Sequence, residues 1–182
     1  MHNLNKQKIA ILAVVVAGLA GIPYLYSSSL ATNIAVAGIY SASLSGDGEI
    51  PKVNTQANGQ ATFESNAQAA ALGDSAAAAS SSSEMSYEIN VHNIDRVTAA
   101  HIHMGRSDEN GPIVVTLFKP KMPTGEITGE LVSGRLSAQN LEGPLQGRQI
   151  SDLVDLFDRG EAYVNLHTVD DPNGEIRGTI QQ

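Results

Sequence analysis

The chain contains no cysteine and no tryptophan in its 182 residues, and only 4% of them are aromatic. The absence of cysteine excludes disulfide bonds, thiolate metal sites, cysteine nucleophiles and lipid attachment at a cysteine. The shortage of aromatic rings argues against a surface on which sugars stack. A domain without disulfides depends on its hydrophobic core, or on a bound metal ion, for stability.

Positive charge is scarce as well. The chain has 11 Lys and Arg residues against 19 Asp and Glu residues, so its formal charge is −8. Lys6 and Lys8 lie near the N-terminus, and a product that begins near Gly38 loses both and reaches −10. Such a surface repels nucleic acid and anionic lipid, and it attracts cations. We therefore expect no nucleic-acid partner.

Sequence signatures of common enzymes are missing. The chain has no Gly-x-Ser-x-Gly elbow, no glycine-rich phosphate loop and no His-Glu-x-x-His helix. Ser133 and Ser137 lie near glycine, but no general base follows at a recognisable spacing. The sequence therefore favours a protein without enzymatic activity, and it predicts no catalytic residue.

Residues 1–37 have the pattern of an export segment. Lys6 and Lys8 precede an apolar run over 9–26, and small residues follow it. One interpretation is a cleaved signal peptide, and the other is a retained membrane anchor, because eighteen mostly apolar residues can just span a bilayer. In both cases we expect residues 38–182 outside the cytoplasm, with membrane contact only through the N-terminal segment.

The rest of the chain predicts an all-β domain, an antiparallel β-sandwich or Greek-key-like barrel. Short runs of alternating apolar and polar residues are separated by Gly, Pro and Asn turns. The Ala- and Ser-rich stretch 65–84 has almost no large side chains, which favours a flexible surface loop. The expected strands are 39–44, 60–64, 85–92, 98–104, 113–118, 161–167 and 175–180.

One short helix is expected to cross an end of the sandwich. Ser151 can cap it, and Gly160 lies where a helix of this length ends. A second short turn is expected at Ser137. The apolar stripe of the helix consists of Ile150, Leu153, Val154 and Phe157.

Three histidines are the most informative residues. His101 and His103 belong to the stretch AAHIHMG at 99–105, and His167 belongs to YVNLHT at 163–168. Side chains alternate between the faces of a strand, so His101 and His103 share a face, with their Cα atoms about 6.5–7 Å apart. If the two strands are neighbours, His167 joins them.

Such a cluster suits Zn²⁺ or Cu²⁺, because imidazole nitrogen binds both ions and three ligands leave one coordination position open. The alternative is structural, with His101 and His103 bonded to loop backbone so that they hold the hairpin ends together. The spacing does not choose between the two metals. His92 is either a fourth ligand or a solvent-exposed side chain, and His2 belongs to the leader.

A weak internal repeat supports convergence of the histidines. Asn110-Gly and Asn173-Gly each follow a histidine-bearing strand and an acidic loop, and each precedes a return strand. Chance similarity is the alternative. The acidic pairs at 108–109 and 170–171 are expected to be solvated turn residues rather than Ca²⁺ ligands, and Arg177 is expected to pair with a carboxylate such as Glu49.

Several of these motifs, in this order, resemble the CHRD domain family. They are LSGDGEIP at 44–51, AAHIHMG at 99–105, NGP at 110–112, YVNLHT at 163–168 and PNGEIRG at 172–178. The resemblance implies a β-sandwich-like secreted domain without an established enzymatic activity. The insert at 65–84 departs from the family pattern.

We therefore expect an exported CHRD-type binding or cell-surface module, with an unknown protein or cell-surface partner. Its expected metal site consists of His101, His103 and His167. The alternative is a small copper or zinc metalloprotein that handles copper or carries out superoxide chemistry. A matrix or filament subunit that assembles through exposed strand edges is a third class.

Overall fold

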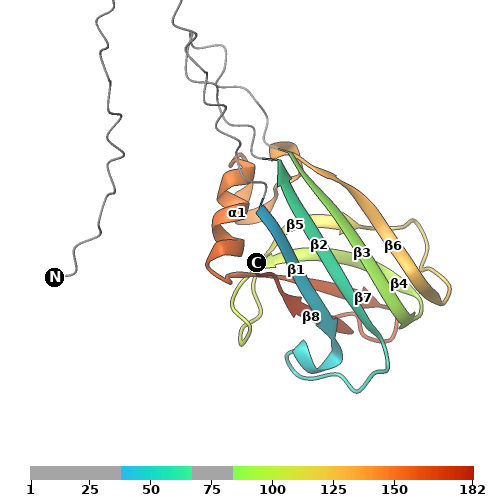
Figure 1. The fold of residues 1–182 in the computed structure, drawn as a ribbon. Helices are drawn as coiled ribbons and strands as arrows, with labels where there is room; N and C mark the ends of the chain where they lie inside the picture. Colours follow the sequence, from blue (N-terminus) through green and yellow to red (C-terminus); the bar gives the residue numbers. More distant parts are fainter. Residues whose placement is uncertain (1–37, 67–83) are drawn as a thin grey trace, which may run out of the picture. The chain divides into compact units, whose positions relative to one another are not determined.

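The computed structural model describes residues 38–66 and 84–182 (Figure 1). The expected leader at 1–37 and most of the expected loop at 65–84 lie outside the described residues. The ends of that expected loop are wrong, because Ser65 and Asn66 belong to one strand and Glu84 begins the next. Within the described residues, no helix has the length and apolar character needed to cross a membrane.

Eight strands form one antiparallel sheet in the order β5-β4-β7-β8-β1-β2-β3-β6, which confirms the all-β prediction. Figure 1 shows β1, β2, β3 and β6 in front of the other four strands. The strands are β1 (Gly38–Ser45), β2 (Asn58–Asn66), β3 (Glu84–Ile94), β4 (Val97–Met104), β5 (Ile113–Phe118), β6 (Ile127–Leu136), β7 (Ala162–Thr168) and β8 (Ile176–Thr179).

The sheet curls into a nearly closed barrel, because its two edge strands approach each other. Tyr87 on β3, next to the edge strand β6, donates a hydrogen bond of 2.8 Å from its hydroxyl to the backbone carbonyl of Leu117 on the other edge strand, β5. Burial raises the pKa of Tyr87, so the phenol keeps the proton that this bond needs. A side chain therefore bridges the seam of the barrel.

The helix α1 (Ile150–Asp158) packs its apolar side against the core through aromatic contacts. The Phe157 ring lies 5.3 Å from the ring of Tyr40 and 5.3 Å from the ring of Phe63, centroid to centroid. The other buried residues of the helix are Ile150, Leu153 and Leu156. These contacts fit the expected crossover helix, because α1 lies on the connection from β6 to β7.

The start of α1 differs from the expectation. Gln149 is its N-cap instead of Ser151, because the carboxylate of Asp152 accepts a 2.9 Å bond from the Gln149 backbone N–H in a capping box. Gly160 follows the helix with φ +63°, as expected for a C-terminal stop. The turn expected at Ser137 is a 3-10 helix over Ala138–Asn140.

Two further 3-10 helices, Gly46–Gly48 and Gly143–Leu145, lie in loops. The strand β6 has no counterpart among the expected strands. It is an edge strand that pairs only with β3, and most of its residues are partly or fully exposed, so its apolar pattern is weak. Gly134 within it leaves room for the Tyr87 ring, since a Cβ there would lie 2.9 Å from a ring carbon.

The antiparallel pair of β4 and β7 confirms that the two histidine-bearing strands are neighbours. His103 lies opposite Tyr163, His101 opposite Asn165 and Ala99 opposite His167. Ile102 on the other face belongs to the hydrophobic core. Each strand also pairs with the return strand of its own hairpin, β4 with β5 and β7 with β8. Because side chains alternate along a strand and Ile102 belongs to the core, the histidines lie on the outer face of the barrel wall.

We expect Tyr87→Phe to destabilise the protein by about 1 kcal/mol, because it removes the hydroxyl that bridges the seam and keeps the ring. Urea unfolding followed by circular dichroism measures this difference. Ser133→Ala, on the outer face of β6, is the control and should leave the midpoint nearly unchanged. Equal midpoints for Tyr87→Phe and wild type would show that the seam bond contributes nothing.

Candidate metal centre

The imidazole rings of His101, His103 and His167 converge on the outer face of β4 and β7. The ring centroids are 5.8 Å apart for the first two residues, 5.0 Å for His101 and His167, and 6.0 Å for His103 and His167. One nitrogen from each ring lies within 4.8 Å of the other two. The structure therefore brings together all three residues that the sequence selected.

Hydrogen bonds define which nitrogens are free. The Nδ1 atom of His103 lies 2.9 Å from the carbonyl oxygen of Gly111, and Nδ1 of His167 lies 3.1 Å from that of Pro172. A carbonyl oxygen only accepts, so each Nδ1 carries the proton of its neutral ring. The Nε2 atom of each ring then presents a lone pair.

Three buried nitrogens have no hydrogen-bond partner among the described residues. They are Nε2 of His103, Nε2 of His167 and Nδ1 of His101. A buried polar atom without a partner is costly, so three of them in one cluster indicate a missing partner that accepts lone pairs. A metal ion is such a partner, and these donors fit one.

The electrostatics keep the rings neutral. Burial, together with the nearby charges of His167 and His103, lowers the pKa of His101 to about 4. Burial also lowers the pKa values of His103 and His167. Neutral imidazole is the form that binds a metal ion, so no proton has to leave near neutral pH.

The spacing is wider than that of a bound ion. With nitrogen–metal bonds of about 2.1 Å, two ligand atoms of a tetrahedral site are about 3.4 Å apart. The observed limit of 4.8 Å therefore requires the widest pair to approach by about 1.4 Å. Rotation of the imidazole side chains has to supply this movement when an ion binds.

The structural alternative is also present in these residues. His103 bonds through Nδ1 to its hairpin loop, as that alternative expects, and His167 does the same in the other hairpin. The loop bond expected from His101 is not found among the described residues, where its buried Nδ1 has no partner. The two bonds that form use only one nitrogen of each ring. Loop attachment and metal binding are therefore compatible in the same side chain.

The expected ion pair between Arg177 and Glu49 is not formed. Arg177 donates instead to the carbonyl oxygens of Arg106 and Glu109, both at 2.8 Å, and to Oδ1 of Asn110 at 2.9 Å. The local spacing of residues on one strand could not show that the 106–110 loop folds back over β8 and occupies the guanidinium.

Glu49 is left as a buried carboxyl whose Oε1 has no partner in the described part of the chain. Burial raises its pKa to about 7, although the positive charge of Arg177 acts in the opposite direction. A Cβ on Gly174 would lie 2.6 Å from this Oε1 and 2.4 Å from Oδ1 of Asn165, so only glycine fits between them. Two acceptor oxygens thus flank one glycine.

Sequence reasoning missed Tyr163 and Asn165, which share the outer face with the histidines. Both are fully buried by loops, and Tyr163 stacks on His103 with ring centroids 4.9 Å apart. The sequence contained a signal for this shared face, because Tyr163 and Asn165 precede His167 by four and two residues on the same strand.

The remaining candidates lie outside the cluster. His92 is exposed on β3, where it pairs with Asn58, so it is not a fourth ligand. Asp170 forms an ion pair with Arg96, and Asp108 is exposed, as expected for turn residues. His2 lies outside the described residues.

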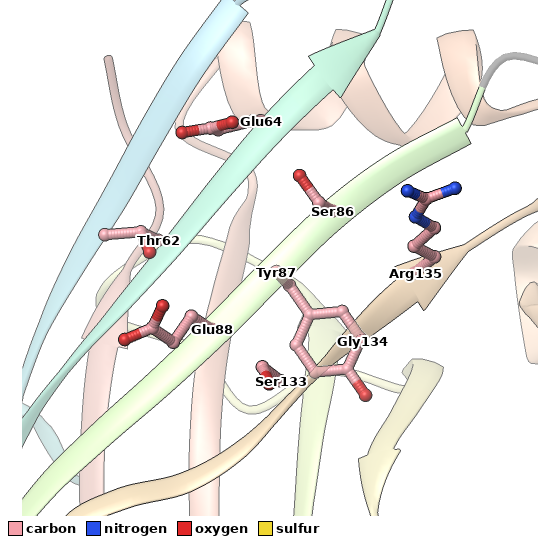
Figure 2. Close-up of a pocket in the computed structure, with 8 residues that line it drawn as sticks. All are labelled: Thr62, Glu64, Ser86, Tyr87, Glu88, Ser133, Gly134 and Arg135. Carbon is pink, nitrogen blue, oxygen red and sulfur yellow. The ribbon is translucent and has the colours of Figure 1, made fainter.

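A shallow groove of about 390 Å³ lies on a different part of the barrel, on the outer face of β2, β3 and β6 (Figure 2). Figure 2 shows carboxylates from two strands and one guanidinium around it. No histidine lines it, so this groove and the histidine cluster are separate features. The lining residues are Thr62, Glu64, Ser86, Tyr87, Glu88, Ser133, Gly134 and Arg135.

We expect Glu49→Gln to stabilise the protein at pH 8 by about 1–3 kcal/mol, because the folded state raises the pKa of this carboxyl from 4.5 to about 7. Below pH 4.5 the carboxyl is protonated in both states and costs nothing, and the cost appears as the pH rises toward 7. Thermal unfolding of both proteins at pH 4 and pH 8 measures the effect. An equal difference at the two pH values would contradict it.

Comparison with known proteins gives one result at the level of the family. No curated protein and no solved structure matches the chain. The family model of the CHRD domain matches residues 40–180, which include every described strand in whole or in part. This range covers most of the chain and contains the three clustered histidines. The chain therefore belongs to the CHRD domain family.

Proposed function

We propose that this protein is an exported, non-enzymatic CHRD binding module that holds one copper or zinc ion. The ligands are Nδ1 of His101, Nε2 of His103 and Nε2 of His167. The observation that carries the proposal is the convergence of the three rings: one nitrogen from each lies within 4.8 Å of the other two, and each ring has a buried nitrogen with no partner in the described structure.

The chemistry of the ligands selects the class of metal. Neutral imidazole suits copper and zinc, whereas calcium and magnesium prefer oxygen ligands. Copper(II) binds nitrogen sites more tightly than zinc does, so we expect the site to bind copper in preference to zinc when both ions compete for it. Three protein ligands leave one position for water or for a group of a partner molecule.

The loops support the centre through backbone carbonyls. Gly111 and Pro172 each accept a hydrogen bond from the Nδ1–H of one histidine. Such bonds to the second ring nitrogen fix the tautomer and the orientation of a metal ligand. The two hairpins therefore hold His103 and His167 with their lone pairs available.

Export is supported by the pattern of residues 1–37 and by the family, whose domains are commonly extracellular. The excess of acidic residues favours attraction of cations to the surface. A binding module of this kind acts through a protein or cell-surface partner.

The second candidate function is redox chemistry, namely copper handling or superoxide turnover. It is favoured by the coordination position that three ligands leave open and by His101, whose side chain is only partly buried. Superoxide turnover by the copper-loaded protein distinguishes this candidate from the binding module.

We expect protein purified without chelator to contain about one copper or zinc ion per chain, as measured by inductively coupled plasma mass spectrometry. His103→Ala removes a ligand and should reduce the bound metal at least tenfold. His92→Ala changes an exposed histidine outside the cluster, and it should retain the full metal content. A wild-type protein that stays metal-free after incubation with each ion would refute the proposal.

We expect the metal-free protein to lose about 1–2 kcal/mol of stability through His101 as the pH falls from 6.5 to about 4. The sign follows from the lowered pKa: above pH 6.5 the ring is neutral in both states, and below it the unfolded chain takes up the proton first. Urea unfolding across this pH range measures the loss. His101→Gln removes the titrating ring, so the variant should gain stability relative to wild type in acid, and a constant difference would contradict the expectation.

A further inference from the structure

We propose that Arg177 is a positioning residue of the metal centre, which sets the orientation of His103 through Tyr163 and the loop 105–112. This inference rests on the proposed function. It concerns a side chain that makes no hydrogen bond to any of the three clustered histidines within the described residues.

Arg177 is a buried cation that is used to hold one loop. Its side chain is 1% exposed, and no carboxylate in the described residues lies within ion-pair distance of it. Its guanidinium donates to the carbonyl oxygens of Arg106 and Glu109 and to Oδ1 of Asn110. The planar fork matches several acceptors at once, which a lysine ammonium does not reproduce.

The same guanidinium also stacks on an aromatic ring. Its central carbon lies 3.4 Å from the centroid of Tyr163. The Tyr163 ring is in turn nearly parallel to the His103 ring, at 9° and 4.9 Å. Because β7 lies between β4 and β8 in the sheet, Tyr163 lies between the other two groups in the stack.

Gly111 connects the loop to the imidazole. Its backbone N–H donates to the hydroxyl of Tyr163 at 3.0 Å, and its carbonyl lies 2.9 Å from Nδ1 of His103. A Cβ at this position would lie 1.7 Å from the carbonyl oxygen of Met104, so the loop can approach only as glycine. The backbone of Gly111 is thus held by Tyr163 on one side and orients the imidazole of His103 on the other.

His167 offers an internal comparison. Its Nδ1 bonds to Pro172 in the other hairpin loop, and Arg177 makes no hydrogen bond to that loop within the described residues. A disturbance at Arg177 or Tyr163 should therefore alter His103 and leave His167 unchanged. General destabilisation of the fold would affect both.

The experiment compares wild type with Tyr163→Phe and Arg177→Lys by ¹⁵N NMR of the imidazoles in the metal-free protein. Wild-type His103 and His167 should both show the tautomer protonated at Nδ1. In each variant His103 should become a mixture of tautomers while His167 keeps its tautomer. Tyr163→Phe keeps the stacked ring and removes only the acceptor for Gly111, so it tests the link through which Arg177 acts even if Arg177→Lys fails to fold. An unchanged His103 tautomer in Tyr163→Phe would then overturn the inference.

The same variants are titrated with Cu²⁺ and with Zn²⁺, and their affinities should fall about 10–100-fold. Ile89→Val, in the core of β3, is the control for stability, and it should lower the unfolding midpoint without changing the His103 tautomer or the affinity. If wild type binds metal and both variants keep its tautomers and affinity, this inference is wrong. If wild type binds neither ion, the proposed function is wrong instead.

Discussion

The antiparallel pairing of β4 with β7 is the constraint on which the rest of the structure depends. It places Ile102 and Val164 in the core on one face and the histidines on the other. Without this pairing His167 would have no reason to lie near His101. Hydrophobic contacts on the inner face therefore hold the two strands together. This pairing places the imidazoles side by side on the outer face, although the core residues lie on the opposite face.

Polar groups on and beside these strands are buried, because hairpin loops fold over them. Asn165 on β7, Arg177 on β8 and Glu49 in the loop after β1 are all at least nine-tenths buried. Burying such groups is costly unless each finds a partner. The guanidinium of Arg177 donates hydrogen bonds to backbone carbonyls, whereas burial raises the pKa of the Glu49 carboxyl. In the described residues, the buried side-chain atoms without a hydrogen-bond partner belong to the three histidines, to Asn165 and to Glu49.

Two of the three clustered histidines use their two ring nitrogens for separate tasks. In His103 and His167 the Nδ1–H attaches a hairpin loop, and the Nε2 lone pair stays available. A structural role and a ligand role therefore do not compete. In His103 the loop attached in this way is 105–112, to which Arg177 also donates hydrogen bonds.

Local pattern was enough to identify most strands, the short helix and the shared face of His101 and His103, since a period of two residues follows directly from strand geometry. It failed for β6, whose exposed edge position leaves little periodicity, and for the N-cap of the helix. The partner of Arg177 and the burial of Tyr163 depend on how the loops fold back across the sheet. Such contacts join residues far apart in the chain, and their energies arise only when packing brings the groups together, so no local pattern can encode them.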